Sequence, residues 1–334
     1  MLELERVTKI YRLGVLGRKA LKAVDSVSFT VARGQVISLI GESGSGKTTI
    51  GRMILRLTPV TFGRILFQGA DISKFHGLAL KNYYRRVQGV FQDPFSSYNP
   101  IFKADRIFNI VQREFFPHLT KGEWRERVAN ALCSVGLEPG EVLGKYPHQL
   151  SGGQLQRLLI ARAMLLEIQF LVADEILSML DASTRIDVLN LLAELKRIRD
   201  LAVLFITHDL SLAYYISDEA IIIYRGYIVE QGAIEKVFVS PLHPYTRMLL
   251  AAVPRLDRKW GPAEVGLKAQ EGKIVGGCPY HDRCLHAEKE ETCKHLKPSL
   301  VFVDDRHSVA CHPMGRLAKG VSHGTSEARG TSVA

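Results

Sequence analysis

The sequence predicts an α/β fold in which a mixed sheet is flanked by helices. Residues 35–40 form an apolar run typical of a buried strand, and residues 50–57 have the pattern of a helix. The glycine-rich stretch 41–49 joins them. A second apolar run, 169–175, ends in two acidic residues. This fold class is predicted by two features: a strand joined to a helix by a glycine-rich loop, and a second strand that ends in acidic residues.

The glycine-rich stretch has the pattern of a phosphate-binding loop, G-x4-G-K-[ST]. Its glycines let backbone N–H groups turn toward phosphate oxygens, and the following helix directs its positive end at the same anion. Lys47 supplies a charge for the β- and γ-phosphates of ATP, and Thr48 supplies a hydroxyl for Mg²⁺. A plain glycine turn is the alternative. The nucleotide-binding residues expected here are Gly41, Ser43, Gly44, Gly46, Lys47, Thr48 and Thr49.

The composition sets the broad class. The chain has 334 residues, 46% of them hydrophobic, which is enough for one large domain and an appendage. The net charge of +10 is spread along the chain, so it fits either solvated surface cations or an anionic partner such as an acidic membrane surface. No apolar run reaches the ~18–20 residues of a membrane span, and the charged start does not resemble a signal peptide. We therefore expect a cytoplasmic protein.

The acidic strand end predicts the catalytic half of the site. A buried strand that delivers a carboxylate beside a phosphate-binding loop suits a Mg²⁺ contact, which we assign to Asp174. Glu175 then lies closer to the γ-phosphate, where it polarises an attacking water. Taken alone, the segment also fits a strand that ends in solvated acids.

A second anion-binding helix end is predicted at residues 150–154, Leu-Ser-Gly-Gly-Gln. A serine in the N-cap position and two glycines open a helix over 155–164. One chain has no evident use for two such ends on one nucleotide. Two chains do, if each lends its second end to the γ-phosphate bound by the other. The residues concerned are Ser151, Gly152, Gly153 and Gln154.

In this order the motifs resemble those of the nucleotide-binding subunit of ATP-binding cassette (ABC) transporters. The resemblance implies a P-loop ATPase core of the ABC type with an inserted helical subdomain. It matches residues 41–48 to Walker A, 150–154 to the signature and 170–175 to Walker B with the catalytic glutamate. It further matches Gln92 to the Q-loop, Ser178 to Asp181 to the D-loop, His208 to the switch histidine and Tyr11 to the aromatic residue that stacks on adenine.

These matches imply particular roles. Gln92 senses Mg²⁺ and water and faces the membrane subunit, and His208 contacts the γ-phosphate. Asp181 belongs to a loop that crosses the dimer interface. The chain departs from the family at Ile176 and Leu177, where Pro-Thr is usual, and at Met179, where Ala is usual. Leu155 also stands where a charged residue is common. We expect hydrolysis to survive, with an altered D-loop.

Two further stretches resemble the oligopeptide, dipeptide and nickel importers: residues 90–100, an extended Q-loop, and residues 240–250. Chemistry alone shows only that prolines in the second stretch mark an element boundary before a helix. The resemblance implies a peripheral subunit at the cytoplasmic face of the membrane. Its partners are a second, related ATPase chain, two membrane permease subunits and, indirectly, an extracytoplasmic solute-binding protein.

The implied function is ATP hydrolysis that energises import of di- or oligopeptides, or of a related solute such as oligosaccharides. Residues Phe91, Phe95, Tyr98 and Phe102 then offer a groove for a membrane subunit, although Phe91 suits ordinary core. The alternative function is that of a soluble ABC ATPase acting on ribosomes or nucleic acid. Proteins of that type carry two ATPase domains in one chain, and we find no internal repeat here, so no nucleic-acid partner is expected.

Four of the five cysteines lie near the C-terminus: Cys278, Cys284, Cys293 and Cys311. They occur in a stretch poor in large aliphatics, where a metal group would supply stability. The resemblance to the importer C-terminal extension favours a [4Fe–4S] cluster; Zn²⁺ and free thiols are the alternatives. Reserve ligands are His281, His286 and His312. Cys133 lies alone in a helical pattern and is expected in the core.

The predicted domain organisation has three parts. Residues 1–255 form the ABC ATPase domain, with the helical subdomain at about 92–165. Residues 256–318 form the C-terminal extension with the four-cysteine site, beginning with a polar linker. Residues 319–334 are rich in Gly, Ser and Thr and are expected to be a disordered tail.

Overall fold

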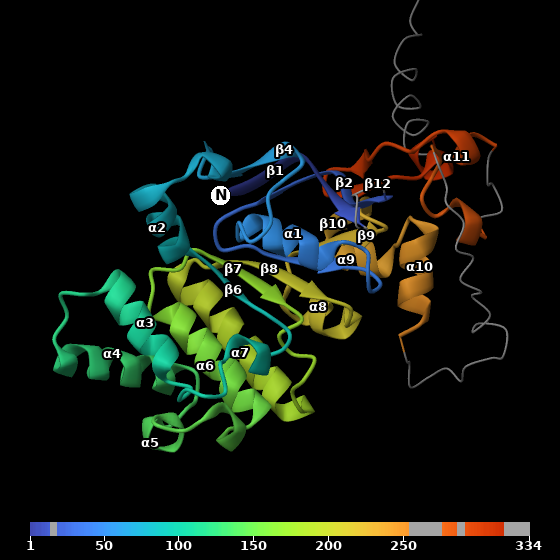
Figure 1. The fold of residues 1–334 in the computed structure, drawn as a ribbon. Helices are drawn as coiled ribbons and strands as arrows, with labels where there is room; N and C mark the ends of the chain where they lie inside the picture. Colours follow the sequence, from blue (N-terminus) through green and yellow to red (C-terminus); the bar gives the residue numbers. More distant parts are fainter. Residues whose placement is uncertain (14–18, 254–275, 286–290, 317–334) are drawn as a thin grey trace, which may run out of the picture. The chain divides into compact units, whose positions relative to one another are not determined.

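The computed structural model describes residues 1–13, 19–253, 276–285 and 291–316 (Figure 1). The chain divides into two compact units that each draw on separate stretches of sequence. The first comprises residues 1–9, 28–37 and 48–207, and the second comprises 10–27, 38–47 and 208–334. Because the boundary falls between Lys47 and Thr48, the phosphate-binding motif contributes to both units.

The described residues contain both strands and helices. The strands are β1 (Leu2–Leu13), β2 (Lys19–Val31), β3 (Val36–Ile40), β4 (Phe62–Phe67), β5 (Ala70–Asp71), β6 (Val87–Val90), β7 (Phe170–Asp174), β8 (Ala202–Thr207), β9 (Glu219–Tyr224), β10 (Tyr227–Ala233), β11 (Val301–Asp304) and β12 (His307–Val309). The helices are α1 (Lys47–Ile54), α2 (Gly77–Arg86), α3 (Arg106–Phe115), α4 (Lys121–Ser134), α5 (Pro139–Val142), α6 (Gly152–Met164), α7 (Ala182–Arg199), α8 (Leu210–Ile216), α9 (Ile234–Val239), α10 (Pro244–Ala251) and α11 (Thr292–His295).

The first unit contains the parallel part of the structure. Strands β6, β7 and β8 lie side by side in parallel, with Val87 opposite Phe170 and Phe170 opposite Ala202. Every residue of β7 and β8 is buried, which is the pattern of a parallel sheet covered on both faces. A second sheet has the strand order β2-β1-β4-β5, in which β4 pairs antiparallel with both β1 and β5. The apolar run at 169–175 is therefore confirmed as a central strand.

Helices α3 to α6 follow one another between β6 and β7 in the first unit, and both α3 and α4 pack against α6 (Figure 1). Helix α4 begins with a complete capping box between Thr120 and Glu123, which satisfies two N–H groups that a helix start leaves open. Its buried residues Trp124, Val128 and Leu132 recur at helical spacing and define the face turned inward. Cys133 is exposed, so the prediction that it lies in the core is wrong. It is the residue after the buried Leu132, and one step along the helix turns its side chain away from the inner face.

The second unit contains an antiparallel sheet that the C-terminal extension completes. Strand β10 pairs with β9 on one side and with β12 on the other, and β11 pairs with β12 at the edge. In the register, Glu230 lies opposite Val309 and Gly232 lies opposite His307. The extension is thus joined to the ATPase core of this unit through backbone hydrogen bonds.

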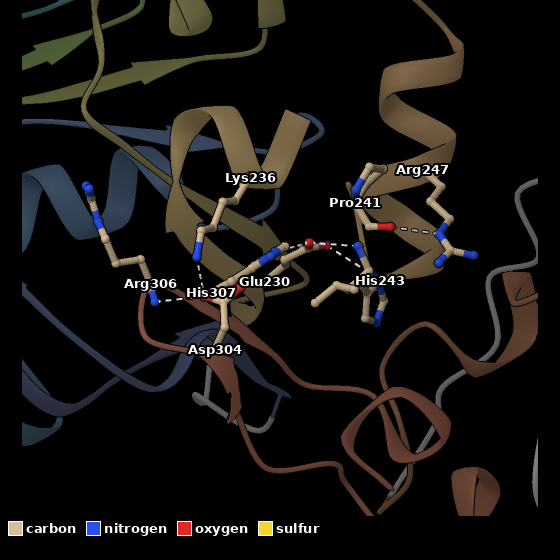
Figure 2. A network of polar contacts seen from close by, with 9 residues as sticks. Glu230, Lys236, Pro241, His243, Arg247, Asp304, Arg306 and His307 are labelled. Atoms are coloured by element: carbon tan, nitrogen blue, oxygen red, sulfur yellow. Dashed lines mark hydrogen bonds and ion pairs between the residues drawn. The ribbon is translucent and has the colours of Figure 1, made fainter. Parts of the chain in front are cut away.

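A buried carboxylate fastens the extension and the segment before α10 to the same strand (Figure 2). Glu230 is fully buried, and its oxygens accept hydrogen bonds from the backbone N–H groups of Leu242 and His243, each at 2.8 Å. The Nε2 atom of His307 lies 2.7 Å from Glu230 Oε1. Nearby, Lys236 pairs with Asp304 at 2.6 Å. One side chain therefore ties together β10, β12 and the turn that precedes α10.

Other sequence expectations have mixed outcomes. The helices predicted after Lys47, after Ser151 and after Pro244 are all confirmed as α1, α6 and α10. The proposed linker start at 256–275 and the tail at 319–334 lie outside the described residues. Within the described ranges, no helix combines the length and apolarity that crossing a membrane requires.

Glu230→Ala should lower the free energy of unfolding by about 3 kcal/mol, because the change leaves buried N–H donors without an acceptor. The measurement is the thermal unfolding midpoint of the full chain. Glu235→Ala, on the exposed side of α9, is the matched control and should leave the midpoint unchanged. Equal midpoints for the two variants would show that the buried network does not hold the extension.

Candidate functional site

The glycine-rich loop of residues 41–47 has a shape that requires glycine at two positions. Gly46 has φ of +104°, and a Cβ there would lie 2.4 Å from the carbonyl oxygen of Ala23. A Cβ on Gly41 would lie 2.2 Å from the carbonyl oxygen of Ile223. The loop therefore lies directly against neighbouring main chain, and a larger residue does not fit at Gly41 or Gly46.

Lys47 lies inside this loop. It is only 5% exposed, and its Nζ donates hydrogen bonds to the carbonyl oxygens of Gly41, at 2.7 Å, and Glu42, at 2.9 Å. These two carbonyls fix the position of the ammonium group. An ammonium group held at this place in the loop suits a charge-assisted hydrogen bond to a phosphate oxygen.

Two oxygen groups of the first unit meet where a Mg²⁺ ion is expected. Thr48 lies in the first turn of α1, and Asp174 is the last residue of β7. The hydroxyl of Thr48 donates to Asp174 Oδ1 at 3.3 Å, and Asp174 is 4% exposed. A hydroxyl and a carboxylate at this separation suit neighbouring positions around one octahedral cation.

Glu175 follows Asp174 with an unusual backbone. Its φ is +50°, a left-handed conformation that costs free energy for any residue with a side chain and that often marks a functional position. Its N–H donates to the carbonyl oxygen of Ile206 on β8 at 2.9 Å. This bond holds the turn, and Glu175 as a whole is half-buried.

The residues that depart from the ABC pattern take different positions. Ile176 and Leu177 are 1% and 2% exposed, so the core of the first unit absorbs them. Met179 is 57% exposed and lies on the surface of the loop. Asp181 forms the N-cap of α7 and accepts hydrogen bonds from Ser183 and Thr184, which lower the pKa of its carboxyl group.

The second predicted anion-binding site is the N-terminus of α6, which has a capping box. Ser151 Oγ accepts a hydrogen bond from the N–H of Gln154 at 3.1 Å, and Gln154 Oε1 accepts one from the N–H of Ser151 at 3.0 Å. This capping box leaves the first-turn amides of Gly152 and Gly153 without intrahelical acceptors. Leu155 is fully buried, which explains an apolar residue where the family often has a charged one.

The same helix holds the root of the predicted Q-loop. Gln156 Nε2 donates to the carbonyl oxygen of Phe91 at 3.4 Å. Arg162 Nη2 donates to Gly89 O at 3.1 Å and to Gln88 Oε1 at 3.3 Å. The Q-loop segment and the signature helix are thus connected at several points within the first unit.

The remaining predicted residues, Gln92, His208 and Tyr11, lie in different parts of the described structure. Gln92 is exposed and follows β6 in the first unit, whereas His208 is exposed and precedes α8 in the second. Tyr11 lies on β1 and is half-buried in the second unit. The first unit carries Thr48, Thr49, Gln92, Ser151, Gly152, Gly153, Gln154, Asp174, Glu175 and Asp181; the second carries Tyr11, Gly41, Ser43, Gly44, Gly46, Lys47 and His208.

The four C-terminal cysteines lie near one another. Cys278 N–H donates to the carbonyl oxygen of Cys293 at 2.8 Å. Burial, together with the neighbouring thiols of Cys293, Cys311 and Cys284, raises the pKa of the Cys278 thiol to about 11. Burial likewise raises the pKa of Cys311 to about 11. Within the described ranges, however, no three or more His, Cys, Asp or Glu side chains are arranged as a group that could hold a metal ion.

The reserve histidines have other contacts. His312 Nε2 lies 2.9 Å from the carbonyl oxygen of Leu296, and His281 Nδ1 lies 3.1 Å from Asp282 Oδ1. His286 lies outside the described residues. The cysteines are therefore the better ligand candidates in this part of the chain.

Sequence reasoning missed residues that support the phosphate-binding loop from a distance. The N–H of Glu42 donates to the hydroxyl of Tyr245 at 2.9 Å, and Arg283 forms an ion pair with the Glu42 carboxylate. The segment around Tyr245 stood out by its prolines alone, and no local pattern relates Arg283 to a loop 241 residues earlier.

Comparison with protein families gives two matches. Residues 24–178 match the family described as ABC transporter, and residues 229–293 match the oligopeptide/dipeptide transporter C-terminal region. The second match includes α10 and three of the four clustered cysteines.

Curated relatives extend over nearly the whole chain. A probable peptide ABC transporter ATP-binding protein of Sinorhizobium fredii is 39% identical over 93% of this chain and 89% of its own length. An oligopeptide transport ATP-binding protein of Bacillus subtilis is 40% identical over 93% of this chain and 97% of its own length.

Solved structures share the fold. A dimeric ATP-binding cassette in a post-hydrolysis state, bound to ADP and Pi, is similar with a TM-score of 0.64 and 27% identity over 70% of this chain and 99% of its own. A component of an ABC transporter complex from Clostridium perfringens has a TM-score of 0.61 and 26% identity over 72% of this chain and 90% of its own. These similarities confirm the predicted fold class.

Lys47→Ala should weaken ATP binding by about 10- to 100-fold, because it removes a charge-assisted contact to phosphate. The measurement is an equilibrium titration with a fluorescent ATP analogue in excess Mg²⁺. Lys121→Ala, at the exposed start of α4, is the control of equal charge change. An unchanged dissociation constant for Lys47→Ala would contradict the assignment of the loop.

Proposed function

The chain belongs to the ATP-binding subunits of ABC transporters, in the oligopeptide and dipeptide group, and on that basis we propose that it drives peptide import with ATP bound between two such subunits. The observation that carries the site assignment is the contact between Thr48 and Asp174. It joins the start of α1 to the end of β7, where the family requires a hydroxyl and a carboxylate for Mg²⁺.

The chemistry in this proposal is positioning and charge stabilisation rather than covalent catalysis. Lys47 holds the β- and γ-phosphates, and Thr48, Asp174 and Gln92 hold Mg²⁺ directly or through water. Glu175 polarises the attacking water, because its carboxylate follows directly after the Mg²⁺ ligand Asp174.

The γ-phosphate and the adenine need further contacts. His208 contacts the γ-phosphate, and Tyr11 stacks on the adenine ring. These two assignments rest on the motif match. Both residues belong to the second unit, as Lys47 does.

The signature end of α6 acts on the nucleotide of a second ATPase chain. Its capping box leaves the amides of Gly152 and Gly153 available to an anion, and the positive helix end favours a phosphate. Ser151 and Gln154 keep this end in shape. Two ATP molecules then lie between two chains, and the closure of the pair on ATP is what moves the membrane subunits.

The extended Q-loop is the surface proposed for the membrane subunits. Phe95 is 47% exposed, Ile101 is 76% exposed and Phe102 is 42% exposed. Exposed apolar side chains gathered in one loop are typical of an interaction surface. Tyr98 is buried and donates from its hydroxyl to Leu155 O at 3.1 Å, so it anchors the loop to α6 rather than lining the surface.

The transported solute is proposed from the relatives, which are named for peptides and oligopeptides. The names give no support to oligosaccharides, nor to the alternative of a ribosome- or nucleic-acid-directed ATPase. The proposal places the chain at the cytoplasmic face of the membrane with two permease subunits and a related ATPase chain, served by a solute-binding protein on the other side.

Cys278, Cys284, Cys293 and Cys311 are proposed to bind a metal group, with a [4Fe–4S] cluster as the first candidate and Zn²⁺ as the alternative. The backbone contact between two of them supports this, since the N–H of Cys278 donates to the carbonyl oxygen of Cys293 at 2.8 Å. Because cysteine binds a metal as the thiolate, binding would displace protons from the thiols. The group would then stabilise an extension that has a small core of its own.

Protein purified without oxygen should carry about four Fe per chain and absorb broadly in the visible range if the cluster is present. One Zn per chain with no visible absorption would identify the alternative. Cys293→Ser should lose the metal, whereas Cys133→Ser, on the exposed face of α4, should retain it. Metal analysis of the three proteins checks this, and absence of both metals from wild type would refute the proposal.

Glu175→Gln should bind ATP normally but release phosphate at least about 100-fold more slowly in the assembled complex, since the variant cannot polarise water. An ATP-bound closed dimer should accumulate and be visible by size-exclusion chromatography. The control is Glu194→Gln, an exposed residue of α7, which should hydrolyse ATP like wild type. Normal turnover by Glu175→Gln would rule out its catalytic role.

A further inference from the structure

Glu42 in the phosphate-binding loop uses all of its polar groups in bonds to other parts of the second unit. Its carbonyl oxygen accepts from Lys47 Nζ at 2.9 Å. Its N–H donates to the hydroxyl of Tyr245 on α10 at 2.9 Å. Its carboxylate binds the Arg283 guanidinium of the C-terminal extension. A residue held at three points transmits any displacement of one of them to the other two.

The ion pair between Arg283 and Glu42 is bidentate. Arg283 Nη1 lies 2.9 Å from Glu42 Oε2, and Nη2 lies 3.0 Å from Oε1. The side chain of Arg283 is 15% exposed and that of Glu42 is 40% exposed. Two parallel bonds from a planar guanidinium fix direction as well as distance. The extension therefore fixes where the Glu42 carboxylate lies.

The support of Arg283 is itself rigid. It ends a 3₁₀ turn, His281–Arg283, directly before Cys284, and its Nη2 also lies 3.5 Å from Met248 Sδ. The guanidinium lies 5.8 Å from the ring centroids of both Tyr224 and Tyr280. The arginine is thus packed in place before it reaches the loop.

Tyr245 is held in the same manner. It is fully buried, and its ring centroid lies 4.7 Å from that of Tyr224 and 5.4 Å from that of Tyr280. Tyr224 belongs to β9, and Tyr280 belongs to the extension. This aromatic cluster joins the sheet, α10 and the extension, and its one hydroxyl in contact with the loop accepts from Glu42.

From these contacts we infer that the C-terminal extension and α10 position the phosphate-binding loop for ATP, with Arg283 of the extension and Tyr245 of α10 as positioning residues that act through Glu42. The inference rests on the proposed function in one respect, namely that Lys47 binds the phosphates. Lys47 takes its position from the carbonyls of Gly41 and Glu42. When Glu42 is fixed, the loop needs less ordering upon binding, and the affinity for ATP rises.

The test compares ATP binding and turnover in the assembled transporter. Arg283→Met removes the charge and the two hydrogen bonds while keeping an apolar side chain. It should raise the dissociation constant and the KM for ATP about five-fold, with kcat at saturating ATP within about two-fold of wild type. Arg283→Lys should recover part of the affinity because the charge returns without the bidentate geometry. Tyr245→Phe should raise the KM for ATP about two- to three-fold, because it removes one hydrogen-bond acceptor.

A matched control separates positioning from general loosening of the extension. Lys236 also joins the core to the extension through Asp304 and has no contact with the loop in the described structure. Lys236→Met should leave the KM for ATP unchanged. A double-mutant cycle of Glu42→Gln with Arg283→Met supplies a second readout. If the pair acts as one unit, the affinity of the double variant for ATP should be no lower than that of the single variant with the lower affinity.

Each outcome decides the matter. Unchanged KM in both Arg283→Met and Tyr245→Phe would overturn the inference, as would an equal rise in Lys236→Met or strictly additive effects in the cycle. A fall in kcat with unchanged KM would assign Arg283 to overall stability instead. If Arg283→Met does not fold, Tyr245→Phe carries the test alone. Failure of wild type itself to bind ATP would refute the proposed function rather than the positioning role.

Discussion

The phosphate-binding loop has few side chains with which to hold its own shape, so its shape depends on the groups around it. Gly41 and Gly46 lie against the carbonyls of Ile223 and Ala23, and Gly226 N–H bonds to Ser45 O at 2.8 Å. Lys47 then completes the loop from inside. Because every phosphate contact starts from this backbone, the surrounding strands and the extension determine how ready the loop is to bind.

In the first unit, helix α6 connects two parts of the proposed site, as the contacts around the phosphate-binding loop do in the second unit. Its N-terminus is proposed to contact the partner's nucleotide, while Gln156 and Arg162 bond to the main chain at the root of the Q-loop. Arg162 is half-buried, and desolvation lowers the pKa of its guanidinium, so its bonds to Gly89 and Gln88 offset the cost of desolvation. A displacement of the Q-loop by a membrane subunit is therefore expected to reach the signature end through hydrogen bonds rather than through loose packing.

Local patterns predicted much of this structure. The strand, loop and helix around Lys47, the capped start of α6 and the acidic end of β7 each depend on residues close in sequence, and all were correctly placed. Long-range contacts were not predictable in this way. Nothing near Glu42 indicates Tyr245 or Arg283, because their partnership depends on how β9, α10 and the extension pack. Cys133 shows the limit of composition, since helical phase rather than residue type puts it on the surface.

The most direct measurement is transport by the complex that contains this chain. Its permease subunits, ATPase partner and solute-binding protein would be co-reconstituted in liposomes, with the ATPase face outward and the binding protein and labelled solute enclosed, and release of the labelled solute from the lumen would be followed. ATP-dependent movement of a short peptide out of the liposome lumen, together with peptide-stimulated phosphate release, is the predicted result. ATP hydrolysis that is indifferent to peptide, with no peptide movement, would contradict the assignment to peptide import.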